Sequence, residues 1–76
     1  MPRGLQPNPH TKLRQLLAQA RDDAGLKQAQ VAALLKRPQS FVSKYENGER
    51  QLDVIEFIDV CKALGVSPSA LIEQLS

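Results

Sequence analysis

The sequence has little of the chemistry on which metalloproteins and disulfide-bonded proteins depend. Its 76 residues include one cysteine, one histidine and no tryptophan. A single cysteine, Cys61, cannot form an internal disulfide, and without a second cysteine or a histidine cluster there is no metal site to build. We therefore predict neither a metal nor a cofactor. Cys61 is expected to be a small buried hydrophobe, with a redox sensor as the alternative.

Arrangements typical of catalysis are also missing. Asp22 and Asp23 are adjacent in a predicted helix, so their side chains point apart. Ser43 has no histidine base within sequence reach, and there is no glycine-rich phosphate loop. The only histidine, His10, follows Pro9 and is expected to be exposed or to cap a helix. We predict that the protein is not an enzyme.

Long apolar runs are absent. None approaches the roughly 18 residues that a membrane span needs, and the N-terminus lacks the apolar core of an export signal. The sequence therefore predicts a cytoplasmic protein without a membrane partner.

The residues that are present suit one small domain. Hydrophobic residues make up 42% of the chain and charged residues 24%, which is enough to form a core. Residues 1–10 contain three prolines and one glycine and show little periodicity, so we predict a flexible arm there and a folded domain over residues 11–76. Arg3 in this arm can reach a minor groove, or the arm can be a tail without a role.

Apolar periodicity and end signals predict an all-α domain of five helices. The first begins between Pro9 and Lys12 and runs to about Ala24. The others are predicted over residues 28–35, 39–46, 54–64 and 68–75. Asp53 followed by Glu56 resembles a capping box for the fourth helix, and a serine before Pro68 suits the start of the fifth.

The second and third of these helices are short and joined by a tight turn. Apolar residues recur at helical spacing before and after the turn, so both helices are expected to share one apolar seam. These residues are Val31, Leu34, Leu35, Phe41, Val42 and Tyr45. Pro38 marks the start of the second segment, and Asn47-Gly48 marks its end because these residues tolerate positive φ. The pattern predicts a helix-turn-helix.

Residues 12–75 resemble the lambda-repressor-like helix-turn-helix family, of the xenobiotic-response-element type. Four runs carry the resemblance together, in this order and spacing. They are Gln28-x-x-Val31-Ala32, Phe41-Val42-Ser43-Lys44, Glu46-Asn47-Gly48-Glu49-Arg50 and Ala63-Leu64-Gly65-Val66-Ser67-Pro68. The resemblance implies a compact five-helix fold that binds double-stranded DNA.

A recognition helix presents its N-terminal residues to base edges in the major groove. The candidates for base readout here are Gln39, Ser40, Ser43 and Lys44. Glutamine can form two hydrogen bonds with the major-groove edge of adenine, at N6 and N7, and lysine can donate to guanine O6 and N7, whereas serine specifies little alone. Val42 and Tyr45 are expected in the core. Phe41 can either cover the junction with the preceding helix or touch a thymine methyl group.

A second set of residues is expected to contact phosphates. Its members are Gln28, Lys36, Arg37, Asn47 and Arg50. The role of Gln28 follows from the resemblance and from its place at a helix N-terminus. The resemblance also implies a structural salt bridge between Arg21 and Glu46. Lys36, Arg37 and Lys27 depart from the family pattern, which more often has glycine, an apolar residue, and serine or threonine there.

Charge is distributed unevenly along the chain. Residues 12–50 hold eight basic and four acidic side chains, whereas residues 51–76 hold one basic and four acidic ones. The balances are therefore +4 and −3, so the first half can face phosphates while the second faces away. The alternative from charge alone is an ordinary mixed surface.

These features predict a regulator that binds DNA in a sequence-specific way. We expect a repressor or an autoregulating controller that binds an inverted repeat as a homodimer, because one small domain reads few bases. Apolar residues of the last two helices are the candidate dimer interface: Ile55, Val66, Ile72 and Leu75. The alternative is an antitoxin or adaptor whose main partner is a protein, which would use the same apolar residues.

Overall fold

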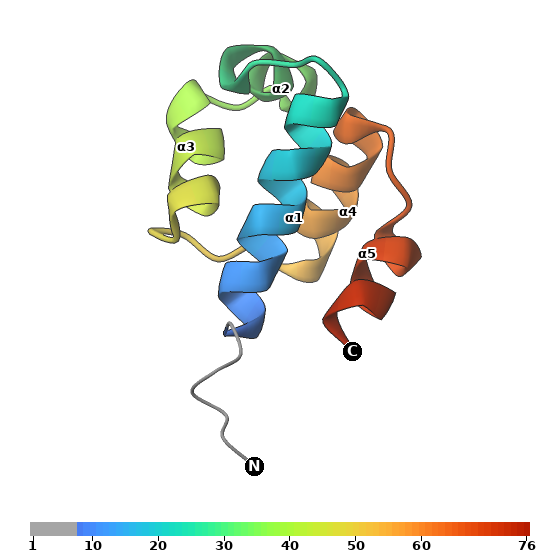
Figure 1. Cartoon of the computed structure of the whole chain (residues 1–76). Coiled ribbons are helices and arrows are strands. Elements are labelled where there is room, and N and C mark those ends of the chain that lie inside the picture. The colour runs from blue at the N-terminus through green and yellow to red at the C-terminus, as the bar shows by residue number, and fades with distance from the viewer. Residues whose placement is uncertain (1–7) are drawn as a thin grey trace.

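The computed structural model describes residues 8–76, and this part of the chain folds into five α-helices without a strand. Figure 1 shows the helices as a small bundle, with α1 running between α3 and α5. The helices are α1 (Pro9–Asp23), α2 (Gln28–Leu35), α3 (Gln39–Asn47), α4 (Val54–Leu64) and α5 (Pro68–Leu75). Helix α2 packs against both α3 and α4, and α1 contacts α3, α4 and α5.

Polar side chains at the helix N-termini explain where several helices begin. The Asn8 side chain accepts a hydrogen bond from the His10 N–H at 2.8 Å, directly before α1. Asp53 accepts from the Glu56 N–H at 2.7 Å, and the Glu56 carboxylate accepts from the Asp53 N–H at 3.1 Å. This reciprocal pair satisfies two amides that a helix N-terminus leaves without partners.

The core is mostly aliphatic, includes three aromatic residues and draws residues from every helix. Its buried members are Leu17 from α1; Val31 and Ala32 from α2; Phe41, Val42 and Tyr45 from α3; Phe57, Val60, Cys61 and Leu64 from α4; and Leu71 from α5. Cys61 is fully buried, and burial raises the pKa of its thiol to about 11. The thiol is therefore protonated and shielded from solvent, which fits the expected small hydrophobe rather than a redox sensor.

Two apolar residues do not lie where periodicity placed them. Leu34 was expected on the seam between α2 and α3, yet it is 58% exposed. Val54 lies seven residues before Cys61, at a spacing that places the two on the same side of a helix, yet it is 69% exposed. Both lie at a helix end, Leu34 in the last turn of α2 and Val54 at the first position of α4, where fewer neighbouring elements cover a side chain.

The helix bounds otherwise follow the prediction closely. Helix α3 ends one residue later than predicted, at Asn47, because Gly48 takes the left-handed conformation at φ 88°. Pro9 and His10 belong to α1, and not to the arm predicted over residues 1–10. Asn8 caps that helix, and residues 1–7 of the predicted arm, including Arg3, lie outside the described residues.

Candidate nucleic-acid interface

The turn between α2 and α3 is fixed by its backbone. Lys36 ends α2 in the left-handed conformation at φ 57°, which allows the Arg37 N–H to donate to the Ala32 carbonyl at 3.0 Å. Pro38 follows in an extended conformation at ψ 153° and immediately precedes α3. Because proline restricts both its own backbone and that of Arg37, this short connection has few alternatives. The relative orientation of the two helices is thereby defined.

Helix α3 has a buried side and an exposed polar side. Val42 and Tyr45 are buried in the core, as the sequence predicts. Gln39, Ser40 and Lys44 are exposed on the helix. Ser43 is half-buried, and its hydroxyl donates to the Ser40 carbonyl at 3.3 Å. The structure therefore leaves Gln39, Ser40 and Lys44 available at the surface, whereas the Ser43 hydroxyl already has a partner.

The residues expected to contact phosphates differ in their surroundings. Lys36 is exposed, and neither it nor Lys44 lies within ion-pair distance of a carboxylate in residues 8–76. The Asn47 side chain instead bonds to Glu49, accepting from its N–H at 3.0 Å and donating to its carboxylate at 3.2 Å. These contacts shape the loop that follows α3.

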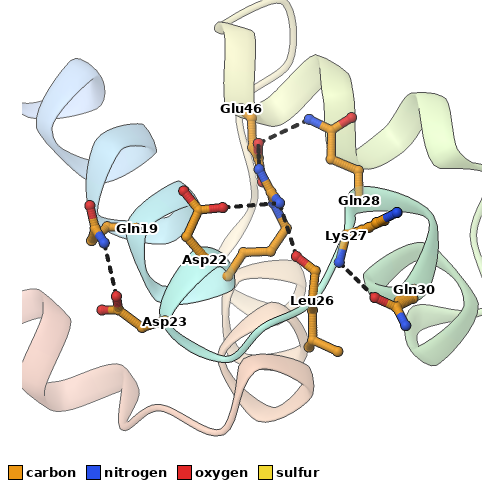
Figure 2. A network of polar contacts seen from close by, with 9 residues as sticks. Gln19, Asp22, Asp23, Leu26, Lys27, Gln28, Gln30 and Glu46 are labelled. Atoms are coloured by element: carbon orange, nitrogen blue, oxygen red, sulfur yellow. Dashed lines mark hydrogen bonds and ion pairs between the residues drawn. The ribbon is translucent and has the colours of Figure 1, made fainter.

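Gln28 is tied into a network around Glu46. Its side-chain amide donates to the Glu46 Oε1 at 3.0 Å, and Figure 2 shows the two side chains pointing toward one another from α2 and α3. The amide nitrogen is therefore engaged inside the protein. A phosphate at the N-terminus of α2 would meet backbone N–H groups and the remaining donor of this amide.

The predicted pair Arg21 and Glu46 lies at the centre of that network. Arg21 Nε donates to Glu46 Oε2 at 2.7 Å, and Nη2 donates to Glu46 Oε1 at 3.1 Å. Arg21 Nη1 also donates to the Leu26 carbonyl at 3.0 Å, so the guanidinium joins α1, α3 and the loop before α2. The hydrogen bond to Glu46 raises the pKa of Arg21, against the opposite effect of burial. This two-point pairing fixes α3 relative to α1.

Arg37 and Arg50 both pair with Glu56, for which the sequence predicts only a role in helix capping. Arg50 donates to both carboxylate oxygens of Glu56, at 2.8 and 2.7 Å, and Arg37 donates to Glu56 Oε2 at 3.3 Å. The pairing with Arg50 is the largest cause that lowers the pKa of Glu56 to about 2. A glutamate three residues after Asp53 signals a cap, but no local pattern predicts its contact with Arg37, 19 residues away.

Phe41 lies close to the same two arginines. The Arg37 guanidinium lies 4.5 Å from its ring centroid and that of Arg50 lies 4.8 Å away. Its ring also meets Tyr45 edge to face, with the centroids 5.5 Å apart. Phe41 is 8% exposed, so it covers the junction of α2 and α3 rather than presenting its ring to a thymine methyl group.

Residues 8–76 contain neither a metal-ion cluster nor a membrane-spanning helix. Within residues 8–76, no three histidine, cysteine, aspartate or glutamate side chains gather in a way that could hold a metal ion. None of the helices α1 to α5 is both long and apolar enough to cross a membrane.

A rigid helix-turn-helix whose second helix has an exposed polar face is the arrangement of helix-turn-helix DNA-binding domains. A helix-turn-helix family model matches residues 17–71. An XRE-family like protein from Pseudomonas syringae pv. tomato str. DC3000 is 54% identical, covers 88% of this chain and 82% of its own, and superimposes with a TM-score of 0.85. The chain therefore belongs to the helix-turn-helix family of XRE and lambda-repressor-like DNA-binding regulators.

Two restriction-modification controller proteins are also similar to it. C.AhdI from Aeromonas hydrophila is 29% identical over 82% of this chain and 94% of its own, with a TM-score of 0.75. C.Esp1396I, solved as a tetramer in complex with its natural 35 base-pair operator, is 21% identical over 92% of either chain, with a TM-score of 0.80. At that identity the second likeness shows the fold alone. Among curated proteins no match is found.

Proposed function

We propose that the protein regulates transcription by binding an inverted repeat in double-stranded DNA as a homodimer, as a repressor or an autoregulating controller. The observation that carries this proposal is the exposed polar side of α3, with Gln39, Ser40 and Lys44 opposite a buried side. Lys36 supplies a positive charge beside it that no carboxylate of residues 8–76 neutralises. Such a helix can enter a major groove while flanking cations contact the backbone.

The division of labour follows from the chemistry of each side chain. Gln39 and Lys44 are the proposed base readers, since an amide suits adenine and an ammonium suits guanine. Ser40 and Ser43 are proposed to contact bases without specifying which base is present. Gln28, Lys36, Arg37, Asn47 and Arg50 are proposed to contact phosphates and set the register of the domain on the duplex. A binding role of this kind requires no catalytic group and no cofactor.

The likeness to C.AhdI supports the controller role, because that protein is a restriction-modification controller of similar length and fold. The proposed dimer contact uses Ile55, Val66, Ile72 and Leu75. Ile55 and Ile72 are exposed, at 66% and 52%, and α4 packs beside α5. We further propose that the protein acts in the cytoplasm, where such operators would lie.

Selection of bound duplexes from a random pool, at fixed salt, tests this function. We expect wild-type protein to enrich a short inverted repeat. Gln39→Ala and Lys44→Ala should each lose preference at particular positions, by about 1–3 kcal/mol per base pair for a two-point contact. Lys62→Ala is the matched control, because Lys62 is an exposed lysine of α4 that is not among the proposed DNA contacts.

The outcomes of this selection separate the possible roles. Loss of preference at defined bases supports direct readout, whereas uniform weakening would assign Gln39 or Lys44 to phosphates. A failure to enrich any duplex, even at low ionic strength, would contradict the proposed function.

A further inference from the structure

Two arginines that are proposed to contact phosphates share one carboxylate and one aromatic ring. Arg50 comes from the loop after α3 and Arg37 from the turn before it, and both donate to Glu56 at the start of α4. The Phe41 ring lies within 5 Å of both guanidinium carbons, at 4.5 and 4.8 Å. The cluster of Arg37, Phe41, Arg50 and Glu56, here called the arginine cluster, therefore ties three segments together at the flank of α3.

A count of hydrogen-bond donors shows what this arrangement leaves free. A guanidinium has five N–H donors in a fixed plane. In Arg50, Nη1 donates to Glu56 Oε1 and to the Gln51 carbonyl at 3.2 Å, and Nη2 donates to Glu56 Oε2. Nε–H and the second N–H of Nη2 remain, and these two form one edge of the guanidinium. Such an edge matches two oxygens of a phosphate.

The arginine cluster is ordered without losing its positive charge or its exposure. Two guanidinium groups face one carboxylate, so the cluster keeps a net charge of +1. The side chains of Arg37 and Arg50 are 44% and 39% exposed, whereas that of Glu56 is 11% exposed. The anchor is thus on the inside and the cations are on the outside, where a phosphate can approach.

We propose that Glu56 and Phe41 are positioning residues that hold Arg50, together with Arg37, as a pre-ordered cradle for a DNA phosphate. The carboxylate fixes one edge of the Arg50 guanidinium and the ring supports its face. The long side chain therefore loses little freedom when DNA binds, and this loss otherwise opposes binding. The inference rests on the proposed function, and it adds two residues that do not themselves contact the DNA.

Glu56→Gln gives a test in which simple electrostatics and positioning predict opposite signs. Glutamine retains a side-chain oxygen for the Asp53 N–H, as capping boxes allow, but it loses the charge that holds the arginines. Removing a negative charge from a DNA-binding protein should, by charge alone, strengthen binding. Positioning predicts that binding weakens, by about three- to tenfold, since one long side chain must be ordered anew.

The measurement is the dissociation constant for a mixed-sequence duplex of about 30 base pairs, which spans two half-sites one helical turn apart. It is repeated between about 50 and 200 mM salt to obtain the salt slope. Glu56→Gln should weaken binding without lowering that slope, because both arginine charges remain. Arg50→Gln should weaken binding and lower the slope by about 0.9, because one phosphate contact is lost.

Three comparisons separate positioning from a purely structural effect. Glu73→Gln on α5 is the matched control, since it removes one exposed carboxylate that has no ion-pair partner in residues 8–76. In an Arg50→Gln background, adding Glu56→Gln should weaken binding much less than it does in the wild type. Phe41→Leu, which keeps an apolar side chain but removes the ring, should also weaken binding with an unchanged salt slope.

Circular dichroism at the assay temperature establishes that each variant is folded. Binding by Glu56→Gln that equals or exceeds binding by Glu73→Gln would overturn the positioning role. If the wild type itself binds no duplex, the proposed function fails, and that result is distinct from a failure of the cradle alone.

Discussion

Lys36 is the one residue other than glycine with positive φ in residues 8–76, and it sits where the turn of the helix-turn-helix changes direction. A side chain in this conformation brings its Cβ close to the following carbonyl oxygen, at a cost of roughly 1–2 kcal/mol. The residue nevertheless places an unpaired ammonium beside α3. Backbone strain and a charge suited to phosphate contact thus occur at the same position.

We expect Lys36→Gly to stabilise the fold by about 1 kcal/mol, because glycine adopts positive φ without this cost. The larger conformational entropy of glycine in the unfolded chain offsets part of the gain. Urea denaturation measures the change. Lys36→Ala removes the same ammonium but keeps a Cβ, so its stability should stay within about 0.5 kcal/mol of the wild type. Equal stability of the glycine and alanine variants would contradict the strain argument. Both variants should bind DNA more weakly.

Glu56 makes stability depend on pH. Arg50 and the Asp53 amide lower its pKa in the folded protein to about 2, from an ordinary value of 4.5. The folded state therefore binds this proton less readily than the unfolded state does. The resulting stabilisation is present above about pH 5 and is lost as pH falls toward 2.

Denaturation at about pH 5 and about pH 3 should show a smaller loss of stability for Glu56→Gln than for the wild type. Glu73→Gln should lose as much stability as the wild type over this interval, because it keeps the Glu56 carboxylate. Identical pH dependence of the wild type and Glu56→Gln would show that the ion pair with Arg50 does not stabilise the fold.

At the scale of elements, the Arg21–Glu46 pair links α1 to α3 and, through Leu26 and Gln28, to the start of α2. The two side chains are 16% and 9% exposed, so the pair is largely but not fully removed from water. Pairs of this kind hold elements in place more than they add net stability, yet loss of one partner leaves the other charge without compensation.

Arg21→Ala should destabilise the domain by about 2–3 kcal/mol, somewhat below the cost for a fully buried pair, because Gln28 still donates to Glu46. Thermal unfolding measures this change. Arg14→Ala is the matched control on α1. Within residues 8–76, the only hydrogen bond of the Arg14 side chain is a long one to the Thr11 hydroxyl, at 3.4 Å. Unchanged stability of Arg21→Ala would exclude the structural role.

At the scale of the whole molecule, the proposed dimer depends on apolar surface that the core does not use. Four large hydrophobic residues among residues 8–76 are exposed: Leu34, Val54, Ile55 and Ile72. The proposed interface includes the last two, on α4 and α5. Leu34 is similarly exposed on α2 and lies outside the proposed interface.

Ile55→Glu should therefore convert a dimer to a monomer, because it places a charge in an apolar contact, and it should weaken binding to an inverted repeat. Sedimentation velocity over a range of concentrations measures the oligomeric state. Leu34→Glu introduces the same charge at another exposed apolar site and should leave the dimer intact. A wild-type protein that stays monomeric, both free and on DNA, would refute the dimer.

Local signals in the sequence determined most of the fold. Five helices were predicted from apolar residues at helical spacing, from the glycines that follow α1 and α3, and from the Asp53–Glu56 capping box. Their ends differ little from the prediction. These signals act over a few residues, so they can be read without knowing how the chain folds back on itself. The exposed polar edge of α3 followed from the same periodicity.

Only the tertiary structure decided which polar side chains already have a hydrogen-bond or ion-pair partner within the protein. Arg37 donates to Glu56 over a separation of 19 residues, and Gln28 donates to Glu46 over a separation of 18 residues. The local spacing of residues predicts neither contact. The exposure of Leu34 was decided in the same way, because burial depends on which helix covers a position. Short-range chemistry thus specified the helices, while packing between distant segments determined which of their charges are held inside the protein and which remain free to meet DNA.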